Sequence, residues 1–234
     1  MLQTTTSLGE LMEHKQAERV FVCGRSGSGK STIVKAMIAE LKAVKLIVFD
    51  VQDEYSKGKP GWVRVTNMKD LIRTMKAKWK KGFKIAYVPT GDLMAVMDKI
   101  AKLVWALQEA YEAGADMRQF TLVVEEADTG MPNRTMPAGM DGIQNLSNRG
   151  RHRGINLIGV SQRPALVHTT FRGNCSSQFV FALANDIDRK QICQTVGPEF
   201  KKELSQMPNF KFWKLKDGRI QRGHTTSSGR YKLS

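Results

Sequence analysis

Short apolar runs alternate along the chain with segments in which apolar residues recur every three or four positions. Apolar runs of about four to eight residues are typical of strands buried on both faces, and the periodic segments are typical of amphipathic helices. The predicted strands are residues 20–23, 45–50, a short run before Asn67, 84–89, 120–128, 155–162, 177–184, 210–216 and 219–224. This alternation predicts an α/β domain, with a mostly parallel central sheet covered by helices on both faces.

Polar residues mark where several of the helices should begin. Asn67 is a predicted N-cap, followed by one apolar helix face of Leu71, Ile72, Met75 and Trp79. Asp92 should cap a long amphipathic helix that ends at Gly114. Further helices are expected after residue 31, at residues 140–148 and from residue 186.

The chain of 234 residues contains no internal repeat and no composition typical of a linker. We therefore expect one domain over residues 20–224, preceded by an N-terminal segment of residues 1–19. Residues 225–234 are polar and basic and should form a flexible tail. No apolar run reaches the ~18 residues of a membrane-spanning helix.

The first predicted strand leads into a loop typical of phosphate binding. Gly24, Gly29, Lys30 and Ser31 match the pattern G-x-x-x-x-G-K-[ST], in which glycines let successive backbone N–H groups point inward. Lys30 should reach the β- and γ-phosphates of ATP, and the Ser31 hydroxyl should bind Mg²⁺. The predicted nucleotide-binding residues are Gly24, Arg25, Ser26, Gly27, Ser28, Gly29, Lys30, Ser31 and Thr32. The alternative is a chance Gly/Ser-rich turn, but the flanking strand and helix favour a P-loop.

Two carboxylates end the predicted strand of residues 120–128, in the stretch LVVEEAD. At the carboxyl edge of a parallel sheet they would lie beside the P-loop. Glu125 is then expected to organise Mg²⁺ and its water ligands, and Glu126 to polarise the attacking water. The alternative is a strand that ends in two acids facing solvent.

A glutamine and an arginine cluster complete the candidate catalytic set. Gln162 ends the strand of residues 155–162, where it could contact the γ-phosphate or the attacking water. Arg149, Arg151 and Arg153 lie just before that strand, and an arginine can neutralise the charge of the transition state. Alternatively, the glutamine satisfies a loop backbone and the arginines end a helix.

The charge balance points to a polyanionic partner. Lysine and arginine number 37, aspartate and glutamate number 22, and the net charge is +15. ATP alone does not require this excess of positive charge, which favours nucleic acid as the partner. A membrane surface is the second choice. The remaining alternative is that the charge serves only solubility. The three cysteines, Cys23, Cys175 and Cys193, have no metal-ligand spacing.

Together, the P-loop, the acid pair, the arginine cluster and GINLIGVSQRP resemble the FtsK–HerA superfamily of DNA-pumping ATPases over residues 20–188. The resemblance assigns the catalytic roles to Glu126, Gln162 and an arginine finger, which counting back eleven residues from Gln162 places at Arg151. The family usually has Asp then Glu where this chain has Glu125 and Glu126. The residue expected to organise the metal, Glu125, therefore departs from the family pattern.

The short chain is most similar to viral genome-packaging members of that superfamily. The resemblance implies Mg²⁺ and ATP as cofactors and a homo-oligomeric ring of five or six subunits around double-stranded DNA, bound without sequence preference. It also implies capsid-vertex or portal partners, and a location in the cytoplasm of an infected host cell or at the packaging vertex of the virion.

Candidate DNA contacts come from two basic segments. One contains Lys76, Lys78, Lys80, Lys81 and Lys84, and the other is the loop of residues 129–140 with Arg134. Phosphate contacts from such side chains would give affinity for DNA of any sequence. A solvated helix face and a plain connector are the respective alternatives.

Three other functions remain open from the residues alone. A P-loop kinase of a nucleotide or small molecule would use the same phosphate cradle, but would not need the positive charge or the arginine cluster. A filamentous-phage-type assembly or secretion ATPase would favour a membrane span or tether. A nucleotide-gated scaffold without activity would not need Lys30 and Glu126 together.

Overall fold

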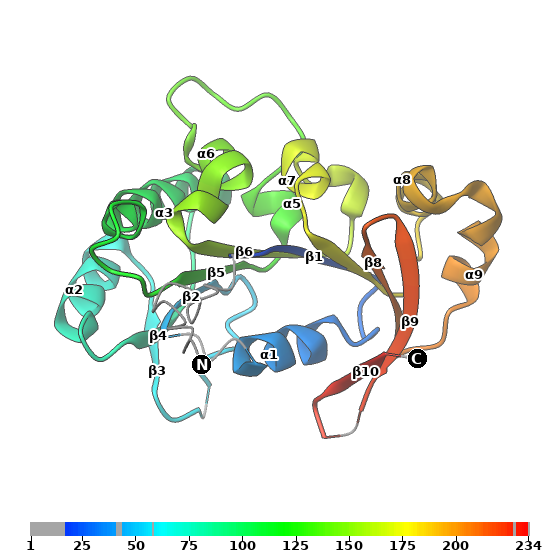
Figure 1. Cartoon of the computed structure of the whole chain (residues 1–234), viewed down its shortest axis with the longest axis horizontal. Helices are drawn as coiled ribbons and strands as arrows, with labels where there is room; N and C mark the ends of the chain where they lie inside the picture. Colours follow the sequence, from blue (N-terminus) through cyan, green and yellow to red (C-terminus); the bar gives the residue numbers. More distant parts are fainter. Residues whose placement is uncertain (1–16, 41–43, 58, 227, 234) are drawn as a thin grey trace, which may run out of the picture.

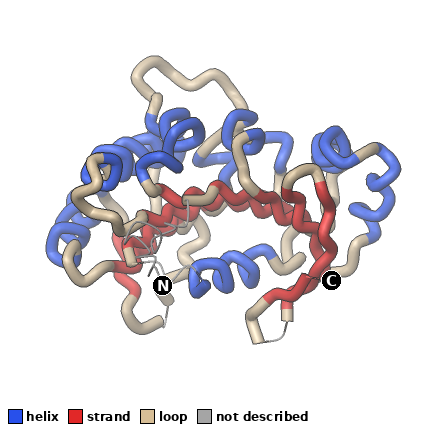
Figure 2. The backbone as a smooth tube through the Cα atoms, viewed as in Figure 1, coloured by secondary structure: helices blue, strands red, loops and turns tan. Residues whose placement is uncertain are grey.

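The computed structural model describes residues 17–40, 44–57, 59–226 and 228–233, so residues 1–16 of the expected N-terminal segment lie outside the described residues. Figures 1 and 2 show a central sheet with helices above and below it. The strands are β1 (Arg19–Cys23), β2 (Lys45–Phe49), β3 (Trp62–Val65), β4 (Phe83–Tyr87), β5 (Phe120–Val124), β6 (Ile155–Ser161), β7 (Ser177–Val180), β8 (Lys211–Lys216), β9 (Arg219–Thr225) and β10 (Tyr231–Leu233).

The helices mostly connect one strand to the next. The α-helices are α1 (Lys30–Glu40), α2 (Met68–Lys78), α3 (Leu93–Leu107), α4 (Glu109–Glu112), α5 (Ala127–Gly130), α6 (Gly142–Arg149), α7 (Thr169–Gly173), α8 (Asp186–Val196) and α9 (Lys201–Gln206). The short 3₁₀ helices are η1 (Gly150–Arg153), η2 (Pro164–Leu166) and η3 (Pro198–Phe200).

The strands form one ten-stranded sheet in the order β10-β9-β8-β7-β1-β6-β5-β2-β4-β3. From β7 to β3 every neighbouring pair is parallel, and β8, β9 and β10 extend the sheet by antiparallel pairing. The predicted α/β fold with a mostly parallel sheet is confirmed. Parallel strands run with their carboxyl ends at one edge, so the loops that follow them share that edge.

Helices cover both faces, but unequally. Figure 1 shows α2, α3, α6 and α7 on one face, while α1 lies against the other. Leu71, Met97, Val104 and Leu146 belong to the larger of the two apolar cores. Residues Ile33, Val34, Phe181 and Phe212 belong to the smaller core on the α1 face. Strands buried from both sides account for the continuous apolar runs in the sequence.

The predicted helix caps are confirmed. The Asn67 side chain accepts a hydrogen bond from the backbone N–H of Asp70 at 2.9 Å, at the start of α2. Asp92 accepts hydrogen bonds from the N–H groups of Met94 and Ala95 at the start of α3. The helix expected to continue to Gly114 is divided, because α3 ends at Leu107 and the short α4 follows.

Several predicted segments differ from the structure. The strand expected over residues 177–184 is shorter, because β7 ends at Val180. The strand expected over residues 120–128 ends at Val124, because Glu126 adopts a left-handed backbone with φ of 48° and α5 begins at Ala127. Within the expected flexible tail, Tyr231–Leu233 forms β10, which pairs with β9. The Tyr231 ring packs 5.9 Å from the Phe179 ring and 6.2 Å from the Phe212 ring, and this apolar contact holds an otherwise polar segment.

A buried ion pair ties the start of β2 to the connection between α4 and β5. The Lys45 side chain is fully buried, and its ammonium group donates to Asp116 at 2.9 Å and lies 4.2 Å from the centre of the Trp79 ring. Arg118 also donates to Asp116, at 2.7 Å. The Arg118 hydrogen bond, aided by Lys45, holds the pKa of the Asp116 carboxyl well below its usual range. Removing Asp116 would leave the Lys45 charge buried without its counter-ion.

We therefore expect Asp116→Asn to lower the free energy of unfolding by about 2 kcal/mol near pH 7, measured by chemical denaturation. Because the folded-state pKa of Asp116 is depressed, its stabilising effect is complete above the unfolded-state pKa near ~3.9 and is lost as pH falls through the folded-state value. The difference between variant and wild type should therefore shrink below about pH 4. Asp70→Asn, in the exposed pair with Arg73, is the matched control and should change stability by under ~1 kcal/mol. Equal effects of the two substitutions would contradict the role of the buried pair.

Candidate active site

The order of four parallel strands gathers the predicted site residues at one edge of the sheet. In the sequence of neighbours β1-β6-β5-β2, the P-loop follows β1, Gln162 follows β6 and the acid pair follows β5. A cavity of about 350 Å³ lies at this edge. Its walls are formed by Ser26, Gly27, Lys30, Ser31, Asp50, Gln52, Glu54, Tyr55, Glu125, Glu126 and Gln162.

The P-loop is fixed to both neighbouring strands. Its backbone donates hydrogen bonds from Gly24 N to the carbonyl of Ser161 and from Arg25 N to the carbonyl of Ala182. Gly24 has φ of +155°, and a Cβ there would lie only 2.5 Å from the Cβ of Phe181. Only glycine fits this approach, so the loop is held in place by the packing that its sequence permits.

Not all nine predicted nucleotide-binding residues face the cavity. Ser26, Gly27, Lys30 and Ser31 line it. Arg25 points its guanidinium to Asn209 at 2.9 Å. Gly24, Ser28, Gly29 and Thr32 are absent from the cavity wall, and Ser28 is fully buried. These residues shape the loop, whose backbone N–H groups are the phosphate ligands in such a cradle.

Lys30 lies across the P-loop. Its ammonium group donates to the carbonyl of Arg25 at 3.0 Å. Burial lowers the pKa of the Lys30 ammonium group, and the charges of Glu125 and Glu126 oppose this shift. Because the bond to Arg25 is its one hydrogen bond among the residues that the structure describes, the ammonium group is available for an anion that enters the cavity.

The two acids differ in their surroundings. Glu125 accepts a hydrogen bond from the Tyr55 hydroxyl at 2.5 Å, and burial raises the pKa of its carboxyl group while this hydrogen bond opposes the rise. Glu126 has a left-handed backbone and lies within 3.5 Å of the Gln162 side-chain amide, Oε1 to Nε2. A non-glycine residue in this backbone region is uncommon and is typical of functional sites. The structure thus brings Glu125, Glu126 and Gln162 together, as the sequence predicted.

Further residues of the β2–β3 connection enter the same cavity. The cavity is lined here by Asp50, Gln52, Glu54 and Tyr55. None of the four was among the site residues predicted from the sequence. The only signal in the sequence was a carboxylate at the end of the strand of residues 45–50. The pairing of β2 beside β5 places this connection against Glu125, and that pairing is a property of the tertiary structure.

The donor atoms of the cavity suit Mg²⁺. The wall holds the four carboxylates of Asp50, Glu54, Glu125 and Glu126, the Ser31 hydroxyl and a single lysine. Hard oxygen donors with an excess of negative charge are the ligands that Mg²⁺ prefers. Among the residues that the structure describes, no three His, Cys, Asp or Glu side chains form a metal cage by themselves. Mg²⁺ is usually held by one or two carboxylates together with phosphate oxygens and water.

The arginine cluster lies far from the cavity of its own chain. Arg151 belongs to η1, directly before β6, whereas Gln162 follows the end of β6. The seven residues of β6 span about 23 Å. Arg151 is therefore at the opposite edge of the sheet from the P-loop of the same chain.

The three arginines have different partners. Arg153 pairs with Glu112 at 2.8 Å, and its guanidinium lies 4.0 Å from the centre of the Trp105 ring. Arg149 donates to Asn145 at 2.8 Å. Arg151 is exposed, and within the described part of the chain its side chain makes no hydrogen bond or ion pair. Arg163, which follows Gln162, is bound at 2.8 Å to the buried Asp188 and supports the loop.

The predicted DNA contacts are not brought together. The lysines at positions 76, 78, 80, 81 and 84 are all exposed, on the end of α2, the following turn and the start of β4. They lie at the sheet edge opposite the cavity. Arg134 lies near the start of α3, with its guanidinium 3.2 Å from the Met94 sulfur, at the same edge as the cavity.

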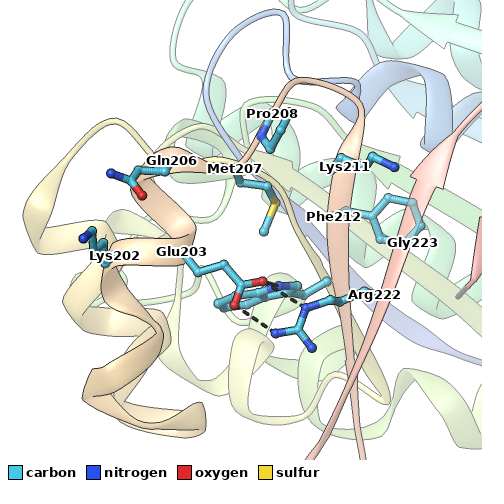
Figure 3. Close-up of a pocket in the computed structure, with 10 residues that line it drawn as sticks. Lys202, Glu203, Gln206, Met207, Pro208, Lys211, Phe212, Arg222 and Gly223 are labelled. Carbon is cyan, nitrogen blue, oxygen red and sulfur yellow. Dashed lines mark hydrogen bonds and ion pairs between the residues drawn. The ribbon is translucent and has the colours of Figure 1, made fainter.

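A larger cavity of about 640 Å³ lies between α9 and the β8–β9 hairpin (Figure 3). Glu203 crosses its floor and accepts hydrogen bonds from Trp213 Nε1 at 2.9 Å and from Arg222 at 2.9 and 3.0 Å. It contains none of the P-loop residues and neither acid of the β5 pair. Size therefore does not identify the phosphate site, whereas the lining residues do.

Residues 17–110 match a family model described as the central domain of the helicase HerA. The matched segment contains the P-loop and the β2–β3 connection, but ends before the acid pair and Gln162. No curated protein matches the sequence.

Solved structures share the fold over nearly the whole chain. The genome-packaging NTPase B204 from Sulfolobus turreted icosahedral virus 2, in complex with ATP-gammaS, is 18% identical, with 89% of this chain and 97% of that chain covered and a TM-score of 0.65. VirB4 of Thermoanaerobacter pseudethanolicus is 12% identical, with coverages of 86% and 87% and a TM-score of 0.63. At these identities the likeness establishes a shared fold. In the described part of the chain, no helix has the length and apolar character needed to cross a bilayer.

Lys30→Ala should weaken ATP binding by roughly 10- to 100-fold, because it removes a charge-assisted hydrogen bond of about 1.5–3 kcal/mol. Binding can be measured by fluorescence with a labelled ATP analogue. The fold should persist, since within the described residues the Lys30 side chain donates only to the carbonyl of Arg25. Lys99→Ala, on the exposed side of α3, is the control and should bind as the wild type does. If the Lys30 variant bound the ATP analogue with unchanged affinity, the assignment of this loop as a P-loop would be wrong.

Proposed function

We propose that this chain is a P-loop ATPase of the HerA/FtsK type, which hydrolyses ATP with Mg²⁺. It moves double-stranded DNA as the motor of a viral genome-packaging machine. One observation carries this proposal: a lysine, two glutamates and a glutamine from three neighbouring strands line one cavity at the P-loop. The similar fold and length of B204, a genome-packaging NTPase, support a role in DNA packaging.

The residues divide the work of hydrolysis. The P-loop backbone and Lys30 hold the β- and γ-phosphates, while Ser31 and Glu125 would hold Mg²⁺, which neutralises phosphate charge when bound. Glu126 accepts the proton of the attacking water. Gln162, whose amide lies 3.5 Å from Glu126 Oε1, orients that water against the γ-phosphate. The four carboxylates that surround one lysine favour binding of further cations.

Arg151 acts in the site of a neighbouring subunit. The seven residues of β6, about 23 Å long, separate Arg151 from the cavity of its own chain, which supports action on another subunit. Within the described part of the chain the exposed Arg151 guanidinium makes no hydrogen bond or ion pair, so it is suited to stabilise transition-state charge on another subunit. Such an arrangement favours a closed ring, in which each site is completed by the next chain. The resemblance to the FtsK–HerA superfamily implies five or six copies.

The net charge of +15 supports sequence-independent binding of DNA. The exposed lysines at positions 76, 78, 80, 81 and 84, together with Arg134, are the proposed phosphate contacts. In a packaging motor the ring would work at a capsid vertex or portal, in the cytoplasm of an infected cell or on the virion. A small-molecule kinase is less well supported. Such an enzyme would need neither the exposed lysines nor an exposed arginine at the sheet edge opposite its own site.

Double-stranded DNA of random sequence should raise the ATPase rate several-fold at ~50 mM salt, and the stimulation should fade by ~200 mM salt. Lys80→Gln/Lys81→Gln should weaken the stimulation, because two candidate phosphate contacts are lost. Lys190→Gln/Lys216→Gln removes the same charge from α8 and β8 and serves as the control. A steady-state ATPase assay across a DNA titration makes the measurement. A rate that does not respond to DNA at low salt would favour the kinase.

Mixing two inactive variants tests the shared site. Arg151→Ala and Glu126→Gln should each lose at least about 100-fold in ATPase rate. Mixed rings should recover activity, because some interfaces pair an intact Glu126 with an intact Arg151. Native mass spectrometry first establishes that subunits exchange, and Arg149→Ala, whose arginine bonds within its own helix, serves as the control. Exchange without recovery would reject Arg151 as a residue that acts on the neighbouring subunit.

A further inference from the structure

A tyrosine from the β2–β3 connection contacts the candidate metal-organising acid. Tyr55 is 2% exposed, and its hydroxyl donates to Oε1 of Glu125 at 2.5 Å. Both residues line the cavity that also contains Ser31. Tyr55 is therefore a buried hydrogen-bond donor aimed at one oxygen of a functional carboxylate, while it lies 70 positions away in the sequence.

The backbone that carries Tyr55 is fixed at both ends. The carboxylate of Asp50, at the end of β2, accepts hydrogen bonds from Glu54 N at 3.0 Å and from Tyr55 N at 2.9 Å. Asp53, with φ of 53°, is held by Arg64 of β3 at 2.9 Å. This turn is thus connected to two strands of the sheet. Each carboxylate oxygen of Asp50 accepts one of the hydrogen bonds that hold the turn.

The ring of Tyr55 is packed from several sides. The Trp62 ring lies 5.7 Å away, centre to centre. The ammonium groups of Lys35 and Lys59 lie 5.4 and 5.5 Å from the centre of the Tyr55 ring. Contacts of this kind hold an aromatic side chain in one orientation. The direction of the hydroxyl is consequently set by the surrounding residues before Glu125 binds it.

Glu125 needs such an anchor more than an aspartate would. A glutamate has one more rotatable bond than an aspartate, so it loses more conformational freedom when its carboxylate is fixed. The Tyr55 hydroxyl occupies Oε1 and leaves Oε2 for other ligands. Partners that orient a ligand in this way commonly tune metal affinity.

We propose that Tyr55 is a positioning residue, which holds Glu125 so that its second carboxylate oxygen serves the Mg²⁺ of bound ATP. This inference rests on the proposed function. It adds Tyr55 to the residues that serve that function, and it explains why a glutamate can act at position 125. Tyr55 thereby supports the metal site without contacting the metal itself.

The test compares nucleotide binding with and without Mg²⁺ in the full chain. Tyr55→Phe keeps the ring and removes only the hydroxyl. Affinity for a fluorescent non-hydrolysable ATP analogue is measured in Mg²⁺ and again in EDTA, together with the melting temperature. The variant should lose about tenfold in the affinity gained from Mg²⁺, while its affinity in EDTA stays at the wild-type value.

Two further variants separate positioning from packing. Tyr87→Phe removes the hydroxyl of another buried tyrosine, whose ring stacks on Phe49, and should keep the full effect of Mg²⁺. Glu125→Asp shortens the acid beyond reach of Tyr55. Adding Tyr55→Phe to Glu125→Asp should therefore cause little further loss, so the two effects should not be additive.

The outcomes distinguish this inference from the function on which it rests. Equal losses in Mg²⁺ and EDTA, an undiminished effect of Mg²⁺, or additive effects with Glu125→Asp would each overturn the positioning role. Wild-type protein that binds no nucleotide in either condition would overturn the proposed function, and this inference with it.

Discussion

The parallel pairing of β6 between β1 and β5 is the constraint on which the site depends. Because of it, the strand that ends in Gln162 lies directly between the P-loop and the acid pair. The hydrogen bond from Gly24 N to the carbonyl of Ser161 connects the loop to the same strand. Exchange of two neighbouring strands would separate these groups by about 5 Å for each strand crossed, which is beyond hydrogen-bond reach.

An excess of carboxylates is the electrostatic consequence of this gathering. Four acids surround Lys30, and such a cluster is unfavourable unless cations or hydrogen-bond donors compensate for it. The protein compensates in part by itself, since backbone N–H groups bind Asp50 and the Tyr55 hydroxyl binds Glu125. The remaining negative charge is what makes the cavity suitable for Mg²⁺.

The antiparallel extension of the sheet supports the P-loop from the other side. Phe210, with φ of 65°, donates its N–H to the carbonyl of Ser28, and Asn209 binds the guanidinium of Arg25. The segment before β8 therefore forms part of the scaffold of the phosphate cradle. These contacts give the β8–β10 region a physical connection to the site.

The local apolar pattern, capping side chains and glycines of the sequence predicted most of the strands, the capped starts of α2 and α3, and the P-loop. Glu125, Glu126 and Gln162 were visible in the sequence as polar groups that follow predicted strands. Only the tertiary structure decided that Tyr55 and Glu54 join them, since the placement of β2 beside β5 leaves no local signal. The position of Arg151 at the edge opposite its own P-loop follows from its place before β6, since Gln162 follows the same strand. The tertiary structure alone showed that β10 orders part of the expected tail. This order depends on contacts of Tyr231 with rings distant in the chain, which local propensity does not encode.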